Sequence, residues 1–103
     1  MSSYTILHTT LKCPRCGEEV ESDLECHFGN TAQMITLKIG DSYPWIEGRQ
    51  PQNGGRPEGD EVYGEGYMEC SACRRDSFLR IIIDGNSIVR AEPDPNRKGY
   101  VPD

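Results

Sequence analysis

The sequence predicts a small all-β domain that is stabilised by a metal ion. Three observations support this: short segments in which apolar and polar residues alternate, two Cys-x-x-Cys pairs, and no helical pattern of useful length. An amphipathic helix would place apolar residues at positions i, i+3, i+4 and i+7. The 103-residue chain is only 35% hydrophobic. We therefore expect a thin core that needs an additional source of stability, such as a bound metal ion.

The first half of the chain contains three expected strands. Residues 4–12 are rich in β-branched side chains and lead directly into Cys13. Over residues 20–28, apolar side chains at even positions alternate with acidic ones, as in a half-buried strand. Residues 34–39 alternate in the same way. These segments predict an antiparallel sheet.

The second half begins with a loop and continues with strands. Residues 48–60 contain no apolar residue except proline and predict a long loop, either functional or mobile. Residues 62–69 lead into the second cysteine pair, and residues 78–91 predict a hairpin around an Asp-Gly-Asn turn. We expect one domain over residues 1–93 and a flexible C-terminal tail over 94–103.

The two cysteine pairs are Cys13-Pro14-Arg15-Cys16 and Cys70-Ser71-Ala72-Cys73. Four thiolates in two close pairs can surround one zinc ion tetrahedrally. Residues 1–12 lack a basic segment followed by an apolar run of about 7 to 15 residues, and no stretch approaches the roughly 18 apolar residues of a membrane span. We therefore expect a cytoplasmic protein, not bound to a membrane, with reduced thiols.

The fragment from Cys13 to Gly17 resembles the first knuckle of the zinc-ribbon (zinc β-ribbon) superfamily, and Cys70 to Cys73 is similar to its second knuckle. The resemblance implies one Zn²⁺ per chain, with residues 20–66 as a β segment and loop inserted between the knuckles and residues 78–91 as the ribbon. It implies four zinc ligands: Cys13, Cys16, Cys70 and Cys73.

The charged residues near the cysteines have an electrostatic explanation. Four thiolates on Zn²⁺ leave a formal charge of −2, which Arg15, Arg74 and Arg75 can compensate, while backbone amides near Gly17 can hydrogen-bond the sulfurs. The net charge is −6, so the average field repels phosphate backbones and anionic membranes. A nucleic-acid partner is therefore disfavoured, and an unidentified protein partner is expected.

Other reactive side chains are expected to have structural roles. Cys26 lies on the apolar face of its strand, where a free cysteine acts as a small hydrophobe. The alternatives for Cys26 are a replacement metal ligand and a reactive thiol. His27 is expected to be exposed, and no chemical role is assigned to His8.

The predicted function is that of a non-catalytic zinc protein that interacts with another protein. A shell of four cysteines has no open position for water, which disfavours hydrolysis. The alternatives are a nucleic-acid-associated zinc ribbon and a rubredoxin-like electron-transfer protein, because four sulfurs also suit iron. A redox enzyme that uses Cys70 and Cys73 as a disulfide pair is a weaker alternative, because no βαβ pattern surrounds either pair.

Overall fold

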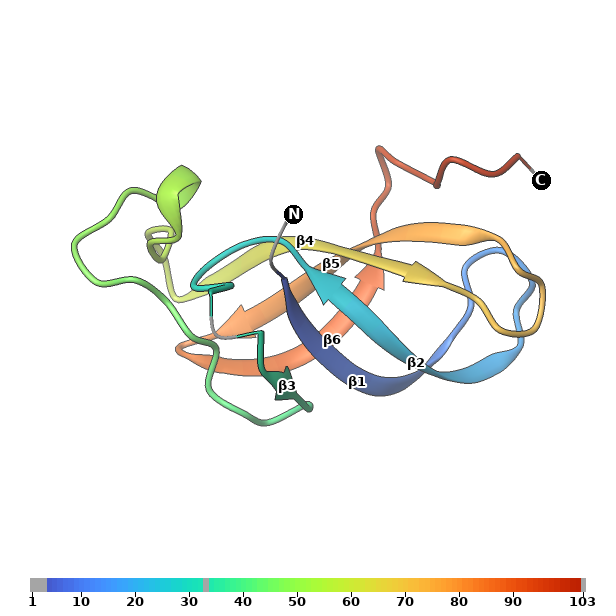
Figure 1. The fold of residues 1–103 in the computed structure, drawn as a ribbon, viewed down its shortest axis with the longest axis horizontal. Coiled ribbons are helices and arrows are strands. Elements are labelled where there is room, and N and C mark those ends of the chain that lie inside the picture. The colour runs from blue at the N-terminus through green and yellow to red at the C-terminus, as the bar shows by residue number, and fades with distance from the viewer. Residues whose placement is uncertain (1–3, 33, 103) are drawn as a thin grey trace.

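The computed structural model describes residues 4–32 and 34–102, and its strands confirm the all-β prediction. These strands form one sheet in the order β3-β1-β2-β4-β5-β6 (Figure 1). Their bounds are β1 (Thr5–Lys12), β2 (Glu19–Cys26), β3 (Thr36–Leu37), β4 (Glu61–Glu69), β5 (Asp76–Asp84) and β6 (Ser87–Pro93). A short 3-10 turn, η1 (Pro51–Asn53), lies between β3 and β4. In the described ranges, no helix has the length and apolar character needed to cross a bilayer.

Two long hairpins make up most of the sheet. Strands β1 and β2 pair antiparallel along their whole length, and so do β4 and β5. Each hairpin turn contains one of the Cys-x-x-Cys pairs, with a strand on either side of it. Because β2 also runs antiparallel to β4, both turns lie at the same end of the sheet (Figure 1, right).

The core lies on the inner face of the curved sheet, as the alternating apolar residues predict. Burying a Leu or Ile side chain stabilises the fold by about 1.5–3 kcal/mol. Strand β5 is buried along nearly its whole length, because its outward-facing side chains are covered as well. The largest side chains that are completely buried include Leu7, Leu24, Met68, Leu79, Ile81, Ile83 and Ile88.

The strand expected over residues 34–39 is shorter than predicted. Only Thr36–Leu37 forms a strand, and it pairs parallel to β1, so the sheet is mixed. The chain leaves β1 after Leu37 because residues 40–43 cross to the opposite edge of the sheet. There the amide of Gly40 donates to Ile88 (2.8 Å) and the amide of Ile88 donates to Asp41 (3.0 Å). This crossing joins the two sheet edges and partly closes a barrel.

Farther along the sheet, at residues 9–12 of β1 and residues 89–91 of β6, the two sheet edges are not joined. A groove of about 370 Å³ lies between β1 and β6 and is lined by residues 9–12 and 89–91 together with Ile39. Ile39 and Val89 are both exposed. This β1–β6 groove leaves two strand edges open to solvent.

The loop over residues 48–60 is held by Arg56. Its guanidinium donates hydrogen bonds to the carbonyl oxygens of Pro57, Gly59, Asp60 and Gly85. Before the loop, the Tyr43 ring stacks on Phe28 with a centroid separation of 4.3 Å. Tyr43 is buried, so these rings close the core.

His8 carries the first testable prediction. Its Nδ1 lies 2.5 Å from an Asp23 oxygen and its Nε2 lies 2.6 Å from a Glu21 oxygen on the neighbouring strand. The hydrogen bonds to Asp23 and then Glu21 raise the pKa of His8 above its ordinary value of 6.5. We expect NMR titration to show this raised pKa, and Asp23→Asn to lower it.

The raised pKa also gives a stability effect with a definite sign. Protonated His8 stabilises the folded state fully below the unfolded pKa, and this contribution is lost as the pH rises through the higher folded pKa. His8→Gln should remove that part of the pH dependence in urea unfolding. A folded-state pKa at or below 6.5 for His8 would contradict the hydrogen-bond geometry.

Candidate metal centre

The two cysteine turns have the same backbone geometry. In the first turn the amide of Gly17 donates to the Cys13 carbonyl (2.9 Å), and in the second the amide of Arg74 donates to the Cys70 carbonyl (2.9 Å). The amides of Cys13 and Cys70 in turn donate to the carbonyls five residues ahead. The two turns are therefore structural equivalents, with Arg74 in the position of Gly17.

The turns bring four sulfur atoms together. The Sγ atoms of Cys13, Cys16, Cys70 and Cys73 all lie within 4.8 Å of one another. Two contacts cross between the turns: Cys13 to Cys73 at 3.9 Å and Cys16 to Cys70 at 3.8 Å. A tetrahedral ion with metal–sulfur bonds of about 2.3 Å has sulfur–sulfur edges of about 3.8 Å. The cluster therefore has the size required for one metal ion.

Backbone amides point at sulfurs of both turns. The amide of Arg15 lies 3.3 Å from the Cys13 sulfur, and the amides of Ala72 and Cys73 lie 3.3 and 3.5 Å from the Cys70 sulfur. Such N–H groups stabilise thiolates and fix their orientation. The expected participation of knuckle amides is therefore observed, but the Gly17 amide itself binds a carbonyl oxygen.

The thiols differ in their acidity. Burial acts to raise the pKa of Cys70, but the amides of Cys73 and Ala72 and the adjacent thiols lower it to about 7. For Cys16 the Glu18 amide acts to lower the pKa, while burial and the three other thiols raise it to about 12. Four sulfurs this close repel one another when ionised, so the cluster needs a cation to hold all four as thiolates.

The three arginines that were predicted to compensate charge lie in different environments. The Arg15 side chain is 1% exposed, and its guanidinium faces Asp76, with Nη1 donating to the Asp76 carbonyl at 2.9 Å and lying 4.0 Å from a carboxylate oxygen. Arg74 is exposed and Arg75 is half-buried. The charge of Arg15 is therefore shared with Asp76, and compensation of the sulfurs by Arg74 and Arg75 stays a prediction.

Asp76 is a residue of the site that sequence reasoning missed. It is 2% exposed and accepts hydrogen bonds from the amides of Tyr100 and Val101 and from the Tyr67 hydroxyl, at 2.9 to 3.0 Å. Burial acts to raise its pKa, but these donors outweigh burial and hold the pKa below the ordinary value of 3.8. The one available signal was an acidic residue at the start of a strongly apolar strand.

The remaining candidates lie outside the sulfur cluster. Cys26 is completely buried in the core, as predicted, and burial raises its pKa to about 12. It is therefore a neutral thiol at physiological pH. His27 is exposed and its Nε2 lies 3.5 Å from a Glu25 oxygen.

The equivalence of Gly17 and Arg74 gives a second testable prediction. Gly17 has φ +79° and Arg74 has φ +61°, a left-handed conformation that is unfavourable for a side chain with a Cβ. We expect Arg74→Gly to raise the free energy of unfolding of the metal-loaded protein by about 0.5–1 kcal/mol, measured by denaturant unfolding.

Gly17→Ala is the matched control in the other turn. A Cβ at Gly17 would contact nothing within 4 Å, so only backbone strain is added and stability should fall by about 1 kcal/mol. If Arg74→Gly destabilised the protein, the side chain of Arg74 would have a stabilising role larger than the strain of its backbone.

Comparison of the chain with protein-family models, with curated proteins and with solved structures finds no match. The fold and the site therefore define the class by themselves: a small all-β protein with a four-cysteine cluster that is suited to a metal ion.

Proposed function

We propose that the cluster holds one structural zinc ion and that the protein is a non-catalytic, zinc-ribbon-like interaction module. The observation that supports it most strongly is the convergence of the four sulfurs within 4.8 Å from two equivalent turns. Four sulfur ligands complete a tetrahedron, so no position stays open for a reacting water or substrate. Zinc supplies folding energy in such a site and no redox chemistry.

Native mass spectrometry with elemental analysis tests the metal assignment. We expect one zinc ion per chain in protein purified without added metal, released by a strong chelator together with loss of structure. Iron in a coloured protein would favour a rubredoxin-like electron carrier, since iron suits the same four sulfurs. Two intramolecular disulfides with no metal would exclude both assignments.

The proposed partner is another protein in the cytoplasm. The β1–β6 groove offers unpaired strand edges and the exposed side chains of Ile39 and Val89, and open strand edges bind extended segments of other chains. A net charge of −6 disfavours nucleic acid as the partner.

Affinity capture with an edge variant tests the interaction role. We expect Val89→Glu to reduce the recovery of specific partners, because it places a charge at the groove, while Tyr63→Glu, on an exposed residue of β4, leaves recovery unchanged. Equal recovery with Val89→Glu and with wild type would show that this edge is not the contact surface. Binding of a nucleic-acid probe at low salt would contradict the choice of a protein partner.

A further inference from the structure

The C-terminal segment folds back onto the metal-centre end of the sheet. Residues 98–101 lie beside Asp76 and Phe78 at the start of β5. The flexibility expected for residues 94–103 stays a prediction, and residue 103 lies outside the described residues. The Phe78 amide donates to the Lys98 carbonyl (3.3 Å), and the Phe78 carbonyl accepts from the Asp94 amide (3.0 Å). We call the surface formed by Arg15, Tyr67, Asp76 and Phe78 the cradle.

Asp76 and Arg15 of the cradle bind the backbone of Tyr100 and Val101. The Asp76 carboxylate accepts from the amides of Tyr100 and Val101, at 2.9 Å in each case. The Arg15 guanidinium donates to the Val101 carbonyl. The cradle therefore binds both the donor and the acceptor of one peptide residue, a mode of recognition that does not depend on the side chain at that position.

Side-chain contacts add a preference for basic and aromatic residues. The guanidinium of Arg97 lies 3.7 Å from the Phe78 ring centroid, and its Nη1 lies 2.9 Å from a Glu65 oxygen. The Tyr100 ring meets Phe78 edge-on, with centroids 5.2 Å apart. Cation–π and aromatic pairs of this kind are attractive beyond the area that they bury.

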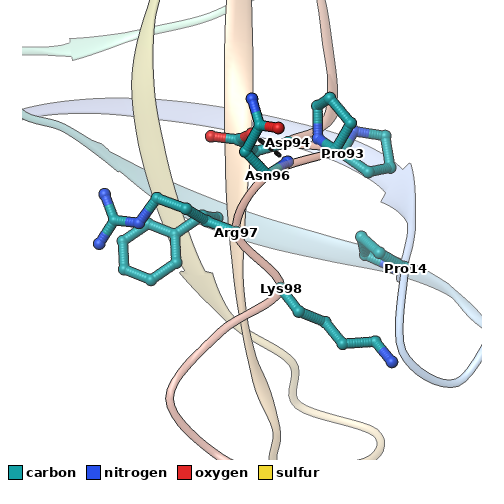
Figure 2. Close-up of a pocket in the computed structure, with 8 residues that line it drawn as sticks. Pro14, Pro93, Asp94, Asn96, Arg97 and Lys98 are labelled. Carbon is teal, nitrogen blue, oxygen red and sulfur yellow. Dashed lines mark hydrogen bonds between the residues drawn. The ribbon is translucent and has the colours of Figure 1, made fainter.

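A pocket adjoins the residues that lead into the bound segment. A pocket of about 380 Å³ lies between the loop 93–98, Phe78 and Pro14 of the first cysteine turn. Figure 2 shows Arg97 over an aromatic ring on one side and the Lys98 side chain extending away from it, with Pro14 facing the loop. The surface around Phe78 therefore has open space beside the segment.

The segment also buries little of its own apolar surface. Tyr100 is 74% exposed and Val101 is 43% exposed. The hydrogen bonds of its backbone to Asp76 and Arg15 are opposed by the conformational entropy that is lost when the segment is ordered. The attachment therefore depends more on hydrogen bonds to Asp76 and Arg15 than on the burial of apolar surface.

Gly99 shows which feature of the segment is indispensable. A Cβ at this position would lie 2.4 Å from the Asp76 carbonyl oxygen and 2.6 Å from Arg15 Nη1. Any segment bound in the same way must have glycine there. The preferred pattern is a basic residue, any residue, glycine and an aromatic residue, as in residues 97–100.

We propose that the cradle is a binding site for an extended basic-aromatic segment of a partner protein, and that residues 97–101 occupy it in the free protein as an intramolecular competitor. This deepens the proposed interaction role and rests on it for the identity of the partner as a protein. Glu25 and Glu65 border the cradle and complement a basic segment. Because Arg15 lies within the first cysteine turn, the metal centre holds the cradle in its binding geometry.

The test uses full-length Gly99→Ala protein, labelled with ¹⁵N and loaded with metal, and an unlabelled peptide of residues 94–102. In this variant the cradle is expected to be empty. We expect the peptide to bind saturably and to return the amide signals of Phe78 and of its neighbours to their wild-type positions. The same peptide with Gly99→Ala should bind at least about tenfold more weakly, whereas a peptide with Asn96→Ala should bind like the parent.

Two results would overturn the proposal. One is the absence of peptide binding by the folded Gly99→Ala protein. The other is a wild-type Tyr100 amide signal that excess peptide leaves unchanged, because the cradle then does not exchange its occupant. This measurement on wild-type protein also covers the case in which the variant does not fold. Displacement of that signal supports the proposal.

Further measurements separate this proposal from related ones. Metal analysis of the same samples distinguishes failure of the zinc assignment from failure of the proposed binding site. Peptide binding by a protein without zinc would contradict only the zinc assignment, and zinc without peptide binding would contradict only the binding site. Light scattering over a concentration series tests a second copy as the occupant. A dimer that forms with wild type and not with Gly99→Ala would overturn the choice of a different protein as the partner.

Discussion

Cys70→Ser is expected to leave the protein largely unfolded at neutral pH. Apparent zinc binding energies in small metal-folded domains are about 10–16 kcal/mol, whereas whole domains are stable by only about 5–15 kcal/mol. Cys70 is buried and accepts two backbone hydrogen bonds on its sulfur, so serine removes a ligand and leaves these amides poorly satisfied. Circular dichroism and metal analysis of the purified variant measure the effect.

Cys26→Ala is the matched control for the loss of a buried cysteine. Cys26 is as deeply buried as Cys70 but lies outside the sulfur cluster. Its replacement should cost about 1 kcal/mol of stability and leave one metal ion per chain. Equal damage from the two substitutions would mean that burial of the thiols, and not metal binding, explains their importance.

Asp76→Ala is expected to have the second-largest effect, a loss of about 3–5 kcal/mol in the free energy of unfolding. The substitution removes the buried carboxylate that lies 4.0 Å from the Arg15 guanidinium, and breaking one half of a buried pair costs about this amount. It also removes the acceptor for the amides of Tyr100 and Val101. Urea unfolding of the metal-loaded protein measures the loss.

The control for Asp76→Ala is Asp84→Ala at the other end of the same strand. Asp84 is exposed, so its removal should change stability by no more than about 0.5 kcal/mol. Similar losses for the two variants would contradict the special role of the Asp76 carboxylate. Hydrogen exchange should also become faster at Tyr100 and Val101 in Asp76→Ala and stay unchanged in Asp84→Ala.

The hairpins and the metal cluster were predictable because local patterns determine them. The alternation over residues 20–28 and the Asp-Gly-Asn turn after residue 83 fix strand and turn without reference to distant contacts. The cysteine spacing fixes the geometry of each turn. Four ligands in two turns then have few ways to share one ion, so the sequence was enough to place the two hairpin ends together.

The short β3 was not predictable, because its end depends on a distant partner. The pattern over residues 34–39 is that of a strand, but Gly40 pairs with Ile88 on the opposite edge of the sheet. This pairing pulls the chain away from β1 after Leu37. Local alternation contains no information about the curvature that brings the edges of β1 and β6 together.

Two further features depend on packing between distant residues and could therefore not be predicted from the sequence. Gly64 had no evident role in the sequence, whereas a Cβ there would lie 2.3 Å from the Phe28 ring, so glycine is needed for close packing. Asp76 resembled a surface acid, but the return of residues 98–101 encloses it. In both cases the deciding neighbour is far away in the chain and has no periodic signal.

X-ray absorption spectroscopy at the zinc edge tests the central claim most directly. We expect one zinc ion per chain surrounded by four sulfur atoms at about 2.3 Å, from Cys13, Cys16, Cys70 and Cys73. A spectrum with nitrogen or oxygen ligands in place of any of the sulfurs, or a protein that is folded without a metal, would contradict it.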